Sequence, residues 1–212
     1  AKPDFNAFSK ENLQSSQKVG ANIADDIKRG AVWATMLALL SIFAYITMRF
    51  PNGRYGLGAV LATSHDGVVI LALFSIFAGI LPFSLEIDQT FIAAFLTIIG
   101  YSVNDTVVIF DRVREYIRNN PKRDLKETMD DAIASTLSRT INVSLSMLLV
   151  VLCLFIFGGD VIRGFAFAMI VGIIVGTYSS IFIASSVVYE FAKGRFNPEG
   201  LAAKNTEAKE IA

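Results

Sequence analysis

One aspartate stands inside an otherwise uncharged apolar run, and it is the residue whose setting points most directly to chemistry. Asp105 lies in the stretch 90–110, which carries no other charge. An α-helix needs roughly 20 apolar residues to cross a bilayer. A carboxylate in such a span costs on the order of 2.5–3.5 kcal/mol on insertion scales, and residues kept there usually mark proton or ion pathways. Asp105 therefore predicts a membrane transport component that handles protons.

Arg139 is the natural partner for this carboxylate, because it opens the next apolar run from the same side. Asp111 marks the boundary of the preceding run, about 9 Å along the helix from Asp105. Burial disfavours a charged carboxylate whereas a neighbouring guanidinium favours it, and such opposed effects can poise a group to take up and release protons. The pair is predicted to be a proton-coupling switch; the alternative is a static ion pair that holds two helices together.

Small polar residues surround Asp105 on the same helical turns. Ser102, Asn104 and Thr106 offer hydroxyls and an amide within three positions of it. These groups are predicted to order the carboxylate or nearby water. The alternative is a role in close helix packing, where such residues are common.

His65 and Asp66 interrupt the second apolar run, and His65 is the only histidine. Adjacent helical residues point about 100° apart, so the two side chains cannot both face one partner squarely. Histidine titrates near neutral pH, which favours a proton-relay role. Equally, Asp66 is expected to form hydrogen bonds within the bundle and fix the position of its helix.

The composition requires a membrane fold, because 53% of the residues are hydrophobic and the mean hydropathy is +0.53. We predict an all-α integral membrane protein with five transmembrane helices. A short amphipathic cytoplasmic helix is predicted between the third and fourth, from apolar spacing within 125–137. The spans are expected at about 30–49, 56–81, 89–112, 138–158 and 162–190.

Lysines and arginines set the predicted orientation. They gather in the connector 113–137 and in the flexible tail 192–212, which the positive-inside rule places in the cytoplasm. The odd number of spans then puts the N-terminus outside, so 1–28 is expected to be the end of an extracytoplasmic region and the helix entry.

Other classes of function find no support in the sequence. The formal net charge is zero, so no nucleic-acid partner is expected, and membrane lipid is the predicted surroundings. No metal cluster, nucleotide loop or nucleophile–base set is seen, so neither a cofactor nor an enzyme activity is predicted.

Cys153 is expected to be a buried inert thiol. Gly172 and Gly176 have the spacing of a close helix-packing face.

Five segments carry a resemblance to a known family. The segment GYSVNDTVVIFDRVRE at 100–115 closely resembles the signature of the SecF family of protein-export membrane proteins. The other four are VGANIADDIKRGA (19–31), SHDGVVI (64–70), LSRTINVS (137–144) and FGGDVIRGFAFAMIVGIIVGTYSSIFIAS (157–185). Ala21 departs from the family's usual proline, which is expected to alter only the helix entry.

The resemblance implies a place in the resistance–nodulation–division superfamily, in which each half has six transmembrane helices. The chain begins with Ala1 rather than Met and is expected to be a piece holding the last five of them. Family members use the proton-motive force to assist preprotein export across the bacterial cytoplasmic membrane, beside a SecD half, the SecYEG channel and the SecA motor. The matching aspartate and arginine, Asp105 and Arg139, are implicated there in proton flow. The alternatives are a structural scaffold without proton coupling and, less well matched, a sibling transporter for a drug or lipid.

Overall fold

The computed structural model describes residues 21–50 and 52–193, and within them it forms a bundle of five long apolar helices. In chain order these are α2 (Ala21–Arg49), α3 (Gly53–Phe77), α4 (Gln89–Asn119) and α5 (Leu125–Phe157), followed by a composite fifth helix. The fifth consists of α6 (Asp160–Ser179), a π-helical turn η1 (Ser180–Ala184) and α7 (Ser185–Lys193). The predicted all-α membrane fold is confirmed.

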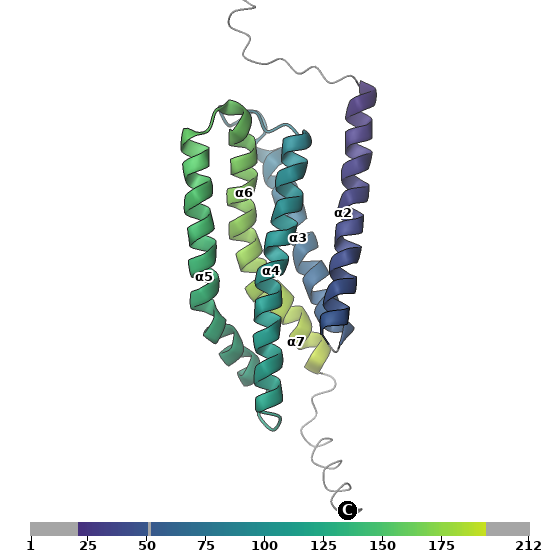
Figure 1. Ribbon diagram of the computed structural model, residues 1–212, viewed down its shortest axis with the longest axis vertical. Coiled ribbons are helices and arrows are strands. Elements are labelled where there is room, and N and C mark those ends of the chain that lie inside the picture. Colours follow the sequence, from purple (N-terminus) through teal and green to yellow (C-terminus); the bar gives the residue numbers. More distant parts are fainter. Residues whose placement is uncertain (1–20, 51, 194–212) are drawn as a thin grey trace, which may run out of the picture.

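The helices divide into a buried centre and exposed edges (Figure 1). In the most apolar part of α4, 50% of the residues are buried, against 17% in α5 and 6% in α2. The α2 helix packs mainly on α3, and it carries Trp33, the only tryptophan in the sequence, at 65% exposure. Helices α2 and α5 therefore offer most of their surface to the surroundings, which for apolar side chains means lipid.

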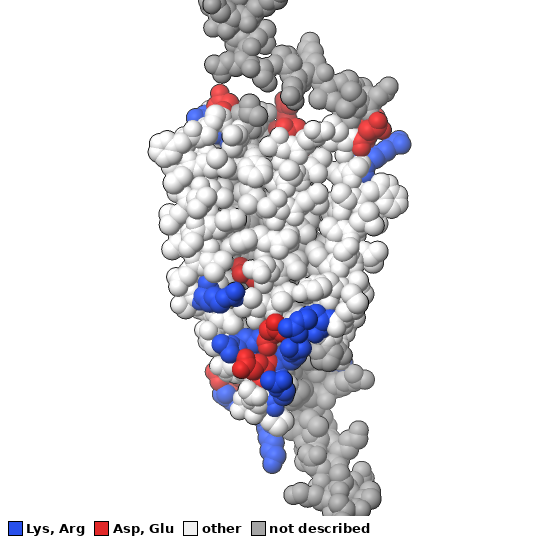
Figure 2. All heavy atoms as spheres, in the orientation of Figure 1, with Lys and Arg blue, Asp and Glu red and all other residues white. Residues whose placement is uncertain are grey.

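Charged residues gather at the two ends of the bundle and leave a broad, largely uncharged band between them (Figure 2). The band is the surface expected of helices that cross hydrocarbon. Two apolar clusters fill the interior. One is centred on Phe50, Tyr55 and Phe110. The other contains Phe74, Phe91 and Ile98.

The helix ends follow local chemistry. Asp88 caps α4 by accepting a 2.8 Å hydrogen bond from the Phe91 amide, and Asp124 caps α5 through the amides of Lys126 and Glu127. The α3 helix ends at Phe77, earlier than the predicted 81, because Gly79 adopts a left-handed φ of 80° that a continuing helix excludes.

The amphipathic helix predicted before the fourth span is present, but as the first turns of α5 instead of a separate element. Figure 1 shows α5 bending toward this end. The hydroxyls of Ser135 and Thr136 donate to the carbonyls of Ala132 and Ile133, a back-bonding pattern that bends helices. The α4 helix continues past the predicted span to Asn119, so only residues 120–124 form the turn between α4 and α5.

Cys153 was expected to be buried, and this is wrong: it is exposed, because it lies on the outer side of the peripheral helix α5. The extracytoplasmic entry predicted for 1–28 and the tail predicted for 192–212 lie mostly outside the described residues.

Candidate functional site

Asp105 is buried in the middle of α4, with 1% of its surface exposed. Its only hydrogen-bond partner among the described residues is the hydroxyl of Ser144 on α5, which donates to Oδ2 over 3.5 Å. This is at the long end of the range for an O–H donor, where the interaction is weak. The α4 helix thus holds a carboxyl group deep in the bundle with little to compensate its charge.

The Ser144 hydroxyl is also shared with other partners. Tyr101 donates its hydroxyl to Ser144 Oγ over 3.2 Å, and Thr177 Oγ1 lies 2.7 Å from the same atom. Thr177 already donates its own proton to the Ile173 carbonyl over 2.8 Å. Since Ser144 has one hydroxyl proton, it can serve either Thr177 or Asp105 at one time. Among the described residues, Asp105 and Thr177 therefore compete for the single proton of Ser144.

Arg139 lies on α5 before Ser144, within electrostatic range of the Asp105 carboxylate. The side chain is exposed, and within the part of the chain that the structure describes it forms no direct ion pair. Next to it, the Thr140 hydroxyl is buried and lacks a hydrogen-bond partner among those residues. Within the described residues, the two members of the predicted pair therefore make no direct contact.

A second buried carboxylate, Asp66 on α3, is much better satisfied. Its exposure is 1%, and Ser102 donates its hydroxyl to Oδ2 over 2.6 Å. His65 Nδ1 lies 3.4 Å from the other carboxylate oxygen, Oδ1, on a side chain that is 38% exposed. These contacts bear out the expectation of a hydrogen bond within the bundle, here between α3 and α4.

The hydrogen bonds continue from Ser102 into the π-helical turn. Thr106 and Ser180 both donate to the Ser102 carbonyl over 3.1 Å, and their own hydroxyl oxygens lie 2.9 Å apart. Gly176 makes this approach possible, because a Cβ there would lie 3.1 Å from Cβ of Ser102. A π-turn inside an α-helix is rare and frequent at functional sites. Thr106 and Ser102 therefore join α4 to η1, whereas Asn104 is exposed on α4 and takes no part in this network.

The polar groups occupy one layer of the bundle. On α3, α4 and the α6–η1 helix they lie between the members of the two apolar clusters, as Asp66 does between Ala62 and Ile70. The sequence had not predicted a role at the site for Ser144, Thr177 or Ser180. Hydroxyl residues are ordinary in apolar helices, and only the packing of α4 against α5 and α6 reveals which of them meet. The described residues hold no group of three His, Cys, Asp or Glu side chains arranged to bind a metal ion.

Comparison with known proteins agrees with this architecture. Residues 2–194 match the family described as protein export membrane protein SecD/SecF, C-terminal. A protein translocase subunit SecF from Rhodothermus marinus is 59% identical over 172 residues, which cover 81% of this chain and 56% of that protein. The SecF subunit from Haemophilus influenzae is 42% identical over 178 residues, 84% of this chain and 53% of its own length. The chain thus spans about half the length of the curated relatives it matches.

A solved structure shares the fold as well. A crystal structure of SecDF in a super-membrane-facing form superposes with a TM-score of 0.73 at 34% identity, over 98% of this chain and 27% of that one. The family match covers nearly all of the sequence, and the five helices carry the motifs on which the resemblance rested. The chain belongs to the SecD/SecF C-terminal family of protein export membrane proteins.

Proposed function

We propose that this chain is part of a multi-pass subunit of the Sec protein-export machinery that uses the proton-motive force to assist preprotein translocation. The family membership and the names of its relatives support a role in export. The observation that carries the proton coupling is the setting of Asp105, which is 1% exposed and holds one long, shared hydrogen bond.

Asp105 is proposed to bind and release the proton. A buried carboxylate without adequate hydrogen bonds is costly when charged, so uptake of a proton relieves the site. Ser144 can turn its hydroxyl from Thr177 toward Asp105 when the carboxylate is charged, and back when it is neutral. The site thereby has two hydrogen-bonding arrangements, one for each protonation state.

Arg139 is proposed to tune this equilibrium from a distance. A positive charge within electrostatic range favours the ionised carboxylate, and its attraction disappears when Asp105 is neutral. Arg139 is exposed and has no direct partner among the described residues, so its side chain is free to respond. Protonation of Asp105 on α4 would thus change the electrostatic force on Arg139 of α5.

Further partners follow from the family. A SecD half, in the same chain or a separate one, is proposed to complete the proton path. The proposed export partners are the SecYEG channel and the preprotein that SecA drives through it. The subunit is proposed to lie in the bacterial cytoplasmic membrane with the basic connector 113–137 and the C-terminus in the cytoplasm. His65 and Asp66 remain candidates for a supporting polar role, and no enzyme activity is proposed.

The alternative is a scaffold subunit, which the well-satisfied Asp66–Ser102 contact between α3 and α4 favours. Replacing Asp105 by Asn in the complete natural protein separates the two functions. Proton-gradient-dependent translocation is measured in membrane vesicles, with assembly checked on the same preparation and Asp160→Asn as an exposed control. Loss of the gradient-dependent component with normal assembly supports proton coupling. Unchanged gradient dependence would leave the scaffold function.

A further inference from the structure

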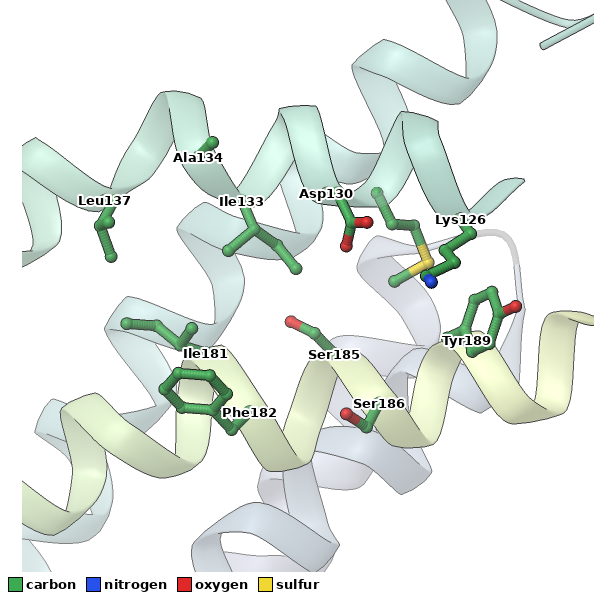
Figure 3. A pocket seen from close by; sticks show the side chains of 11 residues that line it. Lys126, Asp130, Ile133, Ala134, Leu137, Ile181, Phe182, Ser185, Ser186 and Tyr189 are labelled. Carbon is green, nitrogen blue, oxygen red and sulfur yellow. The ribbon is translucent and has the colours of Figure 1, made fainter. Parts of the chain in front are cut away.

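A groove separates the first turns of α5 from the end of the composite fifth helix. Its volume is about 420 Å³, and it runs between residues 126–137 on α5 and residues 181–189 of η1 and α7. We call it the α5–α7 groove. Figure 3 shows the side chains of Ile133 and Asp130 facing those of Ile181 and Ser185 across it.

The α5–α7 groove changes in character along its length. Leu137, Ile133, Ile181 and Phe182 line one end, whereas Lys126 and Tyr189 lie at the other (Figure 3). The span from 126 to 137 is about 16 Å at the helical rise. An occupant that fits must therefore be an amphiphile, apolar at one end and polar at the other.

Two charged side chains of the α5–α7 groove lack partners. Lys126 and Asp130 are exposed, and neither forms an ion pair or a side-chain hydrogen bond within residues 21–50 and 52–193. They lie four positions apart with the base first, the weaker order for an intrahelical pair. Both charges are therefore available to an occupant.

Three other charged side chains of this segment, Arg123, Glu127 and Asp131, are paired with one another. Arg123 donates to Asp131 over 2.5 Å and to Glu127 over 3.3 Å. These hydrogen bonds, the one to Asp131 first, raise the pKa of the Arg123 guanidinium. Three charged side chains outside the groove are thus paired with one another, whereas Lys126 and Asp130, which line it, have no such partner among the described residues.

We infer that the α5–α7 groove binds a zwitterionic aminophospholipid of the phosphatidylethanolamine type. Lys126 matches the phosphate, and Asp130 matches the primary ammonium. The Ser186 hydroxyl, also on the groove, offers a further hydrogen bond. The acyl chain lies against Phe182 and Ile133. This site is separate from the polar layer around Asp105 and does not depend on the proposed proton path.

The position of the groove favours a lipid over a protein partner. It lies at the end of the bundle where α5 bends toward α7, and charged residues gather at that end beside the uncharged band (Figures 1 and 2). Amphipathic segments at such a boundary lie at the level of the lipid headgroups. Basic pockets between transmembrane helices on the cytoplasmic side are known to bind phospholipid head groups.

Native mass spectrometry of the complete natural protein in mild detergent tests the site. The protein is titrated with palmitoyl-oleoyl phosphatidylethanolamine and, separately, with the matching phosphatidylglycerol. We expect preferential retention of phosphatidylethanolamine, about fivefold weaker in Lys126→Gln, the effect of one basic charge at a headgroup. Asp130→Asn should abolish the preference while retaining phosphatidylglycerol, because only the ammonium contact is lost.

Matched controls are Lys122→Gln and Glu127→Gln, which change the same charges in the same segment outside the groove. A photo-crosslinker introduced by Ser186→benzoylphenylalanine should gain the mass of one phospholipid when the native membrane is irradiated. Equal retention of both lipids, unaffected by Lys126→Gln, would mean non-specific boundary lipid and overturn the inference. A crosslink to a polypeptide instead of a lipid would overturn it as well.

Discussion

The hydroxyl of Ser102 on α4 donates a 2.6 Å hydrogen bond to the carboxylate of Asp66 on α3, and both side chains are 1% exposed. The contact fixes two central helices at the layer that also holds Asp105. Removing Ser102 alone would leave the buried Asp66 carboxylate without this donor, whereas removing both side chains would leave no unsatisfied polar group.

Ser102→Ala should lower the free energy of unfolding by about 1–3 kcal/mol, because it leaves a buried carboxylate oxygen without its donor. Adding Asp66→Leu to Ser102→Ala should recover part of the loss, since no unsatisfied polar group then remains. Unfolding of the complete natural protein in detergent measures both. Ser146→Ala, at an exposed hydroxyl on α5, is the control and should change stability little. A loss from Ser102→Ala no larger than from the control would contradict the prediction.

Gly172 is the second test, because Ile98 of α4 occupies the place that a Cβ there would need. Gly172→Ala should therefore destabilise the α4–α6 contact by about 1–3 kcal/mol, the usual effect of overpacking. The matched control is Gly100→Ala on exposed α4 surface, where no atom lies within 4 Å of the added carbon. That substitution should be neutral or stabilise by up to about 1 kcal/mol. The same change in melting temperature for both would refute the close packing.

Asp124 gives a local prediction at the start of α5. Asp124→Ala removes the acceptor for the Lys126 and Glu127 amides, at a cost of about 1 kcal/mol. The first turn of α5 should fray, so its amides should exchange hydrogen faster while those of α4 keep their rates. Lys122→Ala, in the same turn but without a capping contact, should leave exchange unaltered.

Arg139 tests whether charge or contact matters for the proposed coupling. It forms no direct ion pair with Asp105 in the described part of the chain, so the forked geometry of its guanidinium is not used there. Arg139→Lys should keep most of the proton-gradient-dependent translocation, and Arg139→Gln should lose most of it. Vesicle translocation with and without an uncoupler makes the comparison. Equal loss in both variants would instead indicate that a specific guanidinium contact is required.

Thr177 tests the competition for the Ser144 proton. Thr177→Val keeps the shape but removes the oxygen 2.7 Å from Ser144, so that hydroxyl becomes free to donate to Asp105. The carboxyl stretching band assigned to Asp105, identified by its absence in Asp105→Asn, should then shift in infrared difference spectra. An unchanged band would mean that Ser144 does not exchange partners.

The length and charge of the apolar runs predicted five helices, because crossing a bilayer requires about 20 residues without charges. They also identified Asp105, since a charge is conspicuous where it is costly. The helix break at Gly79 and the π-turn 180–184 were not predicted, because neither changes the pattern of polar and apolar residues in segments that are almost uniformly apolar. Cys153 was misplaced for the same reason: uniformly apolar helices do not reveal which side faces the core.

The site was only partly predictable from the sequence. Asp66 and Ser102 stood out as polar residues in apolar runs, but their contact depends on how α3 and α4 are rotated. Chain direction predicted that Arg139 approaches Asp105 from the same side of the bundle. The two make no direct contact among the described residues because the side chain of Arg139 is exposed. Ser144 and Thr177 contribute to the site only because α4, α5 and α6 pack together there.

The exposed position of Trp33 on the peripheral helix has a consequence for spectroscopy. As the only tryptophan of this chain, it supplies nearly all of the intrinsic emission excited at the red edge, and it samples the surface of α2. Lipid exchange or separation of α2 would shift that emission, whereas rearrangement around Asp105 would leave it unchanged. The chain thus carries a natural fluorophore for its periphery, and its centre must be watched by other means.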